Sequence, residues 1–365
     1  MNIKEILKHA TEEKASDIHI VVGLPPILRI STQLIMLNKY GAVTDEQAMT
    51  MLGDIANHQQ IENFNKHQDA DFSTAIDDGT RFRVNAHLQK CSVAIAFRLI
   101  QSNIPNLDSL GLPAIVNELT KLPRGLVLVT GPTGSGKSTT LASMIDQINR
   151  NQAEHIITIE DPVEYDMTSN CSVIEQREIG QDCPNFSSGI RHALRQDPDV
   201  ILVGEMRDLE TTSATITAAE TGHLVFSTLH TNSAAQTVER IIDIYPSTQQ
   251  GQIRSMLANT LQAVVSQTLF KRADQQGMTA CAEILLCNAA VRNCIREDRA
   301  FEIPNILETG VKLGMQSMDR SIAEKLSQGI ITKNDAFAKA FNPGQIQQLR
   351  NYQGESQDRF AKSCV

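Results

Sequence analysis

An apolar run that leads into a glycine-rich segment constrains the fold of this chain more than any other feature. Residues 125–130 read Gly-Leu-Val-Leu-Val-Thr, and residues 131–139 read Gly-Pro-Thr-Gly-Ser-Gly-Lys-Ser-Thr. A glycine, four free positions and Gly-Lys-Ser form a turn whose backbone N–H groups converge on phosphates without obstruction by side chains. Leu141, Ile145 and Ile148 then recur at helical spacing. The sequence therefore predicts a strand, a phosphate-binding loop and a helix in succession.

The loop residues have separate expected roles. Lys137 would reach the phosphates of ATP as a mobile positive charge, and Ser138 would offer its hydroxyl group to Mg²⁺. The N-terminus of the following helix adds a partial positive charge. The candidate nucleotide-binding residues are Gly131, Pro132, Thr133, Gly134, Ser135, Gly136, Lys137, Ser138 and Thr139.

Two groups of carboxylates follow predicted strands. Glu205 comes soon after the apolar run 200–203, where a carboxylate can hold Mg²⁺ and orient the attacking water. Glu164 closes a second acidic cluster and is the candidate base, with Glu160 and Asp161 near the metal or in a supporting position. The alternative for this second cluster is a solvated turn.

A histidine follows a third apolar run, residues 224–226. His230 is expected at the carboxyl end of that strand, where the γ-phosphate would lie. A histidine in such a place is more often a hydrogen-bonded structural residue, and the pattern alone leaves both interpretations open.

Three arginines lie on predicted strands near the N-terminus. Arg81 and Arg83 are two residues apart and share a strand face, and Arg98 lies on the next strand. Arginine can neutralise the charge that develops in phosphoryl transfer, often from a neighbouring subunit. By spacing alone, however, an ordinary surface strand is the better interpretation.

The 365 residues are enough for two domains of about 100 to 200 residues each. Short apolar runs that alternate with helical patterns indicate an α/β protein with a parallel sheet buried on both faces. Helical patterns are expected at 253–269 and 318–329. The expected divisions are a first domain at 1–100, a linker at 101–112, a second domain at 113–350 and a flexible tail at 351–365.

Composition restricts the expected cellular location and the expected classes of partner. A net charge of −9 argues against a broad nucleic-acid-binding face, so no nucleic-acid partner is expected. The seven cysteines form no C-x-x-C pair, which indicates reduced thiols and neither a disulfide framework nor a zinc site. No apolar run is long enough for a transmembrane segment. We therefore expect a cytoplasmic protein.

Several blocks, taken together and in order, resemble the secretion ATPases, and among them the type IV pilus retraction ATPases. Beside the phosphate loop, the blocks are Ser16–His19, Gly23–Pro26, Arg81–Asn85, Ile159–Tyr165, Val203–Thr211, Gly222–Thr231 and Leu313–Gln316. Residues 290–297 are also similar to a C-terminal motif associated with retraction, with the small apolar residues Val291 and Cys294 in place of more usual aliphatic residues.

The resemblance implies a PAS-like N-terminal domain and a RecA-like ATPase domain with a helical C-terminal part. It implies a homohexamer with ATP between domains, in which Arg81, Arg83 and Arg98 act near the nucleotide. An inner-membrane pilus platform protein would be the partner, with an accessory retraction ATPase as a further one, at the cytoplasmic face of the inner membrane. The missing C-x-x-C module favours retraction over pilus extension.

Two other classes of protein stay open at this point. One is a nucleotide-gated scaffold that binds ATP with little turnover, and the other is a RecA-like nucleic-acid translocase. Measured ATP turnover would separate the first from a motor, and DNA-stimulated turnover at low salt would identify the second.

Overall fold

The computed structural model describes residues 1–275, 277–342 and 344, and it divides into two compact units. The first unit comprises Met1–Asn103 with the short segments Asp161–Asp166 and Glu178–Asp182. The second comprises Ile104–Glu160, Met167–Arg177 and the chain from Cys183 onward. The tail expected at 351–365 lies outside the described residues, and the expected domain limits stay a prediction.

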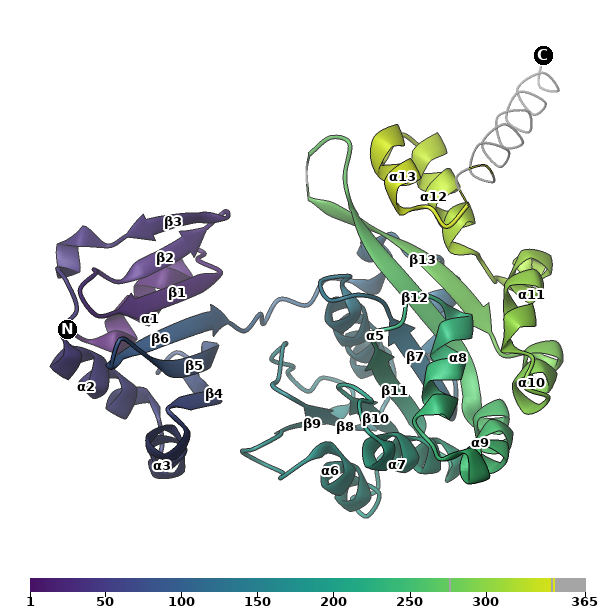
Figure 1. Cartoon of the computed structure of the whole chain (residues 1–365), viewed down its shortest axis with the longest axis horizontal. Coiled ribbons are helices and arrows are strands. Elements are labelled where there is room, and N and C mark those ends of the chain that lie inside the picture. Colours follow the sequence, from purple (N-terminus) through teal and green to yellow (C-terminus); the bar gives the residue numbers. More distant parts are fainter. Residues whose placement is uncertain (276, 343, 345–365) are drawn as a thin grey trace. The chain divides into compact units, whose positions relative to one another are not determined.

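The first unit is a six-stranded antiparallel sheet with helices (Figure 1). Its strands pair in the order β3-β2-β1-β6-β5-β4, so the first and last hairpins of the unit lie on opposite sides of β1 and β6. The elements are α1 (Ile3–Glu12), β1 (Asp17–Val21), β2 (Ile27–Ile30), β3 (Gln33–Met36), the 3₁₀ helix η1 (Asn38–Tyr40), α2 (Asp45–Ile55), α3 (His58–His67), β4 (Asp69–Ala75), β5 (Arg81–Gln89) and β6 (Ser92–Leu99).

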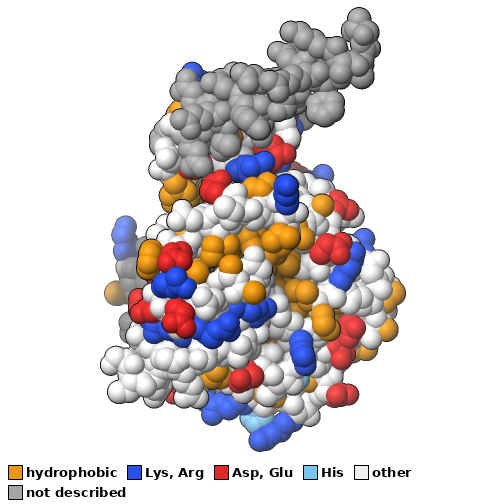
Figure 2. All heavy atoms as spheres, turned by 90° about the vertical axis from the view of Figure 1, so that its right-hand side faces the viewer, with side chains coloured by type: hydrophobic (Ala, Val, Ile, Leu, Met, Phe, Trp, Pro, Cys, Tyr) orange, Lys and Arg blue, Asp and Glu red, His pale blue; other side chains and the backbone are white. Residues whose placement is uncertain are grey.

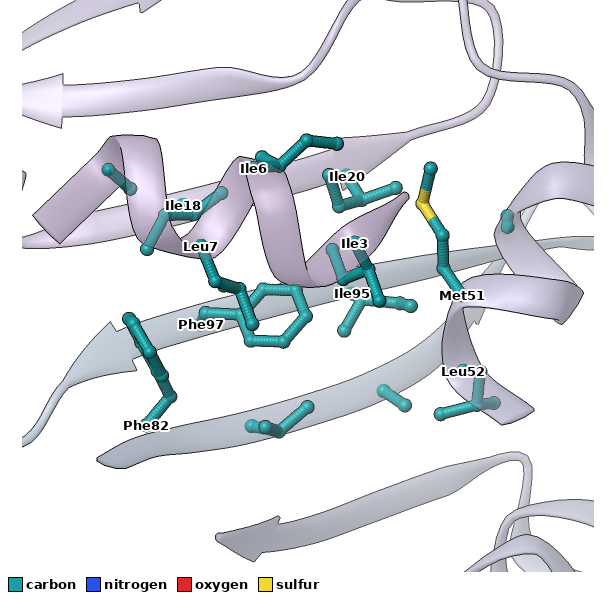
Figure 3. Close-up of a cluster of buried hydrophobic side chains, with 14 of the residues drawn as sticks. Ile3, Ile6, Leu7, Ile18, Ile20, Met51, Leu52, Phe82, Ile95 and Phe97 are labelled. Atoms are coloured by element: carbon teal, nitrogen blue, oxygen red, sulfur yellow. The ribbon is translucent and has the colours of Figure 1, made fainter. Parts of the chain in front are cut away.

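Helix α1 packs its apolar face on one face of this sheet. The side chains of Ile3, Ile6 and Leu7 are fully buried, as the helical spacing predicts, and lie against Ile95 and Phe97 of β6 (Figure 3). Strands with alternating apolar and polar residues place their other side chains on the opposite face. The polar and charged residues of β1, β5 and β6 therefore lie together, away from the core.

Local signals start the two following helices. Thr44 and Gln47 form a capping box at the start of α2, as a threonine followed three residues later by a glutamine predicts. Asn57 and Gln60 form a second capping box at the start of α3, a helix that the sequence analysis did not anticipate. Only Phe64 of α3 is fully buried, so its apolar period is too weak to predict a helix.

The second unit is built on a seven-stranded sheet in the order β13-β12-β7-β11-β10-β8-β9 (Figure 1). Strands β8, β10, β11, β7 and β12 pair in parallel, and β13 adds an antiparallel strand beside β12. Its strands are β7 (Gly125–Thr130), β8 (His155–Glu160), β9 (Val173–Glu178), β10 (Val200–Val203), β11 (Leu224–Leu229), β12 (Leu261–Lys271) and β13 (Met278–Leu286).

Helices surround that sheet and form the C-terminal part. Val127 and Val129 of β7 pack with Leu141 and Ile145 of α5 in the main core of this unit. The helices, with 3₁₀ helices marked η, are η2 (Leu107–Leu110), α4 (Ile115–Leu119), α5 (Lys137–Asn151), α6 (Phe186–Ala193), α7 (Leu209–Glu220), α8 (Ala234–Asp243), α9 (Ser247–Thr260), α10 (Ala289–Arg296), η3 (Ala300–Glu302), α11 (Ile303–Thr309), η4 (Val311–Leu313), α12 (Met318–Ser327) and α13 (Lys333–Lys339).

The helix expected at 253–269 is wrong in its second half. Helix α9 ends at Thr260, and the chain continues directly into strand β12. The strand lies between β7 and β13, and most of its side chains are buried. A strand that is buried on both faces has no alternating pattern, so periodicity cannot distinguish it from a buried helix.

Two other expectations concern the C-terminal part and membrane insertion. Helix α10 buries Val291, Cys294 and Ile295, so the two smaller residues of the 290–297 motif lie on its packed face. Within the part of the chain that the structure describes, no helix combines the length and apolar character that a bilayer crossing requires.

Candidate active site

The glycine-rich loop joins the end of β7 to the start of α5. Gly131 and Gly136 have φ angles of 141° and 88°, in the region that favours glycine. A Cβ atom on Gly131 would collide with the backbone carbonyl of Gln267 and with the side chain of Ser135. The loop therefore depends on glycine both for its turn and for its close approach to strand β12.

The residues of the loop suit a phosphate group. Lys137 is buried, and its Nζ donates to the backbone carbonyls of Gly131 at 3.0 Å and Pro132 at 3.1 Å. The hydroxyl of Ser135 is buried and has no hydrogen-bond partner among the described residues. No side chain caps the start of α5, and an uncapped helix N-terminus of this kind favours an anion.

A buried glutamine that the sequence analysis missed supports the loop from β12. Gln267 donates from Nε2 to the carbonyl of Ser135 at 2.7 Å, and its Oε1 accepts from the hydroxyl of Thr140 at 3.0 Å. One side chain therefore holds both the loop and the first turn of α5. The expected helix at 253–269 concealed this residue, because only a strand places it beside the loop.

Glu205 and His230 come together at the carboxyl ends of neighbouring strands. Glu205 follows β10 and His230 follows β11, and His230 Nε2 lies 3.4 Å from Glu205 Oε2. Arg207 Nε lies 2.5 Å from the other carboxylate oxygen of Glu205. The hydroxyl of Thr228 donates to the carbonyl of Gly204 at 2.6 Å and ties the two strand ends together. Since β11 also pairs with β7, this pair stands at the sheet edge from which the phosphate loop emerges.

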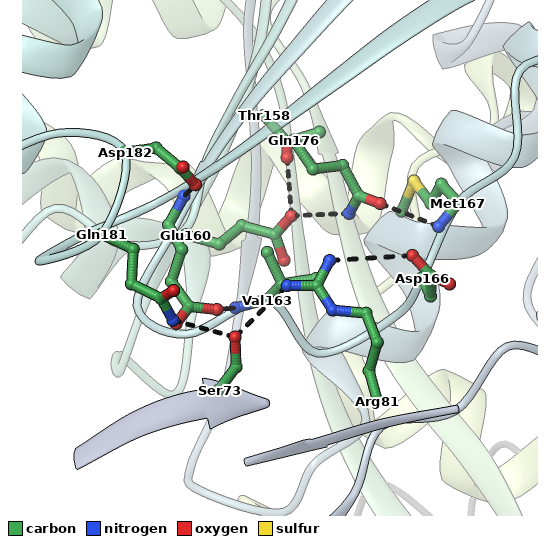
Figure 4. Close-up of polar contacts among 11 residues, drawn as sticks. Ser73, Arg81, Thr158, Glu160, Val163, Asp166, Met167, Gln176, Gln181 and Asp182 are labelled. Carbon is green, nitrogen blue, oxygen red and sulfur yellow. Dashed lines mark hydrogen bonds and ion pairs between the residues drawn. The ribbon is translucent and has the colours of Figure 1, made fainter. Parts of the chain in front are cut away.

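Glu160 is buried at the end of β8 and is held by its neighbours. Its carboxylate accepts from the hydroxyl of Thr158 at 2.7 Å and from Gln176 Nε2 at 3.2 Å (Figure 4). Both donors fix its orientation, and a buried carboxylate needs such bonds. This geometry suits the supporting position that the sequence analysis gave it as one alternative.

The other predicted residues of the site belong to the first unit. Glu164 is exposed in the segment Asp161–Asp166. Arg81 Nη1 lies 3.9 Å from Asp166 Oδ1, and its Nη2 donates to Ser73 at 3.2 Å (Figure 4). Ser73 lies on the neighbouring strand β4, whereas Asp166 is distant along the chain and could not be recognised as a partner from the sequence.

Arg83 and Arg98 are direct cross-strand neighbours on β5 and β6, so their side chains share one face of the sheet. Arg83 lies 3.9 Å from Asp71, and Arg98 Nε donates to Asp17 Oδ1 at 2.9 Å. Burial raises the pKa of Asp17, but hydrogen bonds from Ser16 and Arg98 outweigh this effect, and the net pKa lies below 3.8. These pairs arise from the register between neighbouring strands, which cannot be read from the sequence.

A magnesium ion at this site would need oxygen ligands. Among residues 1–275, 277–342 and 344, no three His, Cys, Asp or Glu side chains form a group that could hold a metal ion. Mg²⁺ commonly keeps several waters and binds nucleotide phosphates with only one or two protein oxygens. Ser138 and Glu205 are the candidates for those oxygens.

The chain is similar to known proteins over nearly its whole length. It is 43% identical over 343 residues to the "Type IV pilus retractation ATPase PilT" of Pseudomonas aeruginosa, covering 94% of this chain and 99% of the relative. It is also 43% identical to the "Twitching motility protein" of Neisseria gonorrhoeae, covering 93% of this chain and 91% of the relative. The "Type IV pilus ATPase PilU" of Pseudomonas aeruginosa is 36% identical, with 98% and 93% covered.

Solved structures are also similar to this chain. A crystal structure of the pilus retraction motor PilT with bound ADP has a TM-score of 0.89 and 42% identity, covering 95% of this chain and 99% of that one. The ATPase DotB of Legionella pneumophila has a TM-score of 0.81 and 30% identity, with 92% and 93% covered. The predicted fold class, an α/β protein with a PAS-like first domain and a RecA-like ATPase domain, is confirmed. A family model described as "Type II/IV secretion system protein" matches residues 1–339, and the chain belongs to this family.

Proposed function

We propose that the protein is an Mg²⁺-dependent ATPase that drives retraction of a type IV pilus and so twitching motility. The observation that carries this proposal is 43% identity with the retraction ATPase PilT over 94% of this chain and 99% of that relative. The phosphate loop and the Glu205–His230 pair supply the chemistry that such an activity requires.

The candidate site residues of the second unit have separate roles in the proposed reaction. Lys137 binds the β- and γ-phosphates, Ser138 and Glu205 provide oxygens for the metal site, and His230 detects the γ-phosphate. Mg²⁺, when bound, offsets the charge of the phosphates and stabilises the leaving group. The 3.4 Å contact between His230 and Glu205 supports joint action, because it places the imidazole ring beside the carboxylate proposed for the metal site.

Two roles belong to residues of the first unit. Glu164 is the proposed base that activates water, and its exposed position supports a role toward a solvent molecule. Arg81, Arg83 and Arg98 are the proposed arginines that neutralise transition-state charge. Their common location on one face of the sheet supports this assignment.

We further propose that the protein acts as a homohexamer. The face of the second unit on which α8 to α11 lie carries a broad band of hydrophobic side chains (Figure 2). Phe301 and Leu313, on either side of α11, have exposed fractions of 71% and 58%. Exposed apolar surface of this kind supports protein–protein contact, either between subunits or with the proposed inner-membrane platform protein.

The proposed place of work is the cytoplasmic face of the inner membrane. There the ring would contact the platform protein, and an accessory retraction ATPase would be a further partner. This chain is itself 36% identical to the type IV pilus ATPase PilU of Pseudomonas aeruginosa, which supports an accessory ATPase of the same family as a partner.

Two measurements test the enzymatic part. Purified protein should hydrolyse ATP, and Lys137→Ala should abolish turnover, whereas a scaffold that only binds ATP would show negligible turnover in both. Glu164→Ala should retain ATP binding and lose turnover. An unchanged rate in Glu164→Ala would remove the proposed base.

The pilus phenotype of a deletion strain tests whether the protein drives pilus retraction. A deletion strain should carry abundant surface pili that do not retract, and the intact gene should restore retraction. Loss of all pili would contradict the proposal and indicate a role in assembly. Stimulation of ATP turnover by DNA at low salt would instead identify a nucleic-acid translocase.

A further inference from the structure

A half-buried glutamine on β9 joins the two ends of a short acidic segment, residues 161–166, which carries the proposed base Glu164 (the Glu164 segment). Gln176 Oε1 accepts the backbone N–H of Met167, directly after this segment, at 2.8 Å (Figure 4). Gln176 Nε2 donates to Glu160 Oε1, directly before the segment, at 3.2 Å. One side chain therefore bridges the base of this loop.

The two residues that Gln176 joins belong to the second unit, whereas the Glu164 segment between them belongs to the first. Glu160 is the last residue of β8, and its buried carboxylate also accepts from the hydroxyl of Thr158 at 2.7 Å. The side chain of Met167 packs against the main core of the second unit. Gln176 therefore links the point where the chain leaves the second unit to the point where it returns.

The middle of the Glu164 segment is held by another residue of the same strand. Glu178 is buried, and its Oε2 accepts the backbone N–H of Val163 at 3.3 Å, one residue before Glu164. Gln176 and Glu178 are two residues apart in β9, so their side chains lie on one face of the strand. This face of β9 therefore contacts the loop at its base and at its middle.

The position of the Glu164 carboxylate depends on the backbone of its segment. Glu164 is exposed, so burial in a core does not fix its side chain. A general base must be held within about 0.5 Å of its productive position. A loop whose ends are joined has fewer conformations than one whose ends are free to separate. The bonds of Gln176 at the base of the loop therefore restrict where Glu164 can lie.

We propose that Gln176 is a positioning residue that closes the Glu164 segment and so sets the place of the Glu164 carboxylate. The proposal rests on the ATPase activity proposed above and on the role of Glu164 as its base. Gln176 acts through the peptide group of Met167 and the carboxylate of Glu160, the two stems of the loop.

Gln176→Met is the appropriate variant because methionine keeps the length of the side chain and has neither the amide donor nor the amide oxygen. Both bonds to the stems of the loop are lost. In the full-length protein, we expect kcat for ATP to fall by about tenfold to a hundredfold, because the base is misplaced. KM for ATP should stay within about twofold, since the phosphate loop is unchanged. Gln176→Asn, which withdraws the amide by one methylene, should give the same result if Gln176→Met does not fold.

Gln152→Met is the matched control for loss of a glutamine hydrogen bond in the second unit. Gln152 is also half-buried, and its Nε2 donates to the carbonyl of Thr120, the C-cap residue of α4, at 2.9 Å. This variant should lower Tm and leave kcat unchanged. An equal loss of kcat in Gln152→Met and Gln176→Met would reduce the effect to general destabilisation and overturn the proposal.

A double variant distinguishes an effect through Glu164 from an effect through Glu160 alone. If Gln176 acts by positioning Glu164, Gln176→Met should lower kcat no further in the Glu164→Ala background. Additive losses would overturn the proposal, as would wild-type kcat in Gln176→Met. A wild-type rate in Glu164→Ala, or no turnover in the wild-type protein, would instead remove the proposed base or the proposed ATPase activity, and the role of Gln176 with it.

Hydrogen exchange measures the closure of the loop independently of turnover. The amide of Met167 should exchange faster in Gln176→Met than in the wild-type protein, and that of Val163 should follow as the loop opens. Gln152→Met should match the wild-type protein at both amides. Wild-type exchange at Met167 in Gln176→Met would show that Gln176 does not hold the loop and would overturn the proposal.

Discussion

Gln267 Nε2 donates a 2.7 Å hydrogen bond to the backbone carbonyl of Ser135, 132 residues away along the chain. This bond joins β12 to the middle of the phosphate loop, and the same side chain accepts from Thr140. The loop therefore has its shape from two sources, namely glycines that permit its turn and a glutamine that holds it in place.

Gln267→Ala should weaken nucleotide binding. The change leaves the buried carbonyl of Ser135 without its partner, which costs about 1–3 kcal/mol, and it frees the loop to adopt other shapes. We expect a rise in the Kd for ATP of about tenfold, measured by titration with a fluorescent ATP analogue.

Thr268→Ala is the control for Gln267→Ala. Thr268 is the next residue of β12 and is half-buried, and its side chain lies on the other face of the sheet. Binding close to that of the wild-type protein is expected. If Gln267→Ala also binds ATP normally, the loop does not need this support.

Glu205→Gln should separate ATP binding from hydrolysis. Loss of the negative charge weakens the metal site and the contact with His230, so we expect kcat to fall by about a hundredfold with little change in ATP affinity. Steady-state turnover and nucleotide binding measure the two quantities separately.

Glu210→Gln serves as the control for that change. The carboxylate of Glu210 has an exposed fraction of 75% and forms a surface pair with Arg191 at 3.6 Å, which contributes little. Its turnover should equal that of the wild-type protein. Equal rates in all three proteins would exclude Glu205 from the reaction.

Asp17→Asn should reduce stability at neutral pH and not in strong acid. Because the folded-state pKa of Asp17 lies below 3.8, its stabilisation is fully present above that value and is lost as the pH falls through the lower, folded pKa. Loss of the negative charge weakens the bond from Arg98 and should cost about 1 kcal/mol at pH 7. Urea unfolding at pH 7, pH 5 and pH 2 would show the gap to wild type closing in acid.

The control for this pH series is Asp77→Asn. Asp77 is exposed and pairs with Lys4 at the surface at 3.0 Å, where ion pairs contribute little. Its stability should follow that of the wild-type protein at each pH. A constant gap between wild type and Asp17→Asn at all pH values would show that ionisation of Asp17 does not contribute.

The cysteines should divide into reactive and inert groups. Burial raises the pKa of Cys281 to about 11 and that of Cys287 to about 12. Cys91 and Cys171 are exposed. Because the thiolate is the reactive form, iodoacetamide at pH 8 should label the exposed pair in the native protein and the buried pair only after unfolding. Mass spectrometry of the labelled peptides measures this, and labelling of Cys287 in the native state would contradict its burial.

Sequence patterns predicted the elements whose residues differ between faces. Ile3, Ile6 and Leu7 repeat at helical spacing because one face of α1 is buried, and Thr44 with Gln47 marks the start of α2 by direct local bonding. Strand β12 was missed because it is buried on both faces. Burial on one face leaves a period in the sequence, whereas burial on both faces removes it.

The residues of the candidate site also divide into those with a local sequence signal and those without one. Lys137 and Ser138 stand in a motif whose spacing is local, and Glu205 and His230 follow recognisable strands. Gln267 carries no local signal, since its importance comes from the neighbour that the sheet order gives it. The arginines show the same limit, because only cross-strand register pairs Arg98 with Asp17. The roles assigned to these residues in catalysis stay predictions.

The bond between Gln267 and Ser135 also affects how the protein matures during synthesis. A ribosome releases the phosphate loop well before Gln267, because the two partners are 132 residues apart, and domains form as the chain emerges. Until β12 joins β7, the nascent chain lacks the side chain that holds the loop. A polypeptide arrested before β12 would therefore carry the complete glycine-lysine motif and still bind ATP poorly.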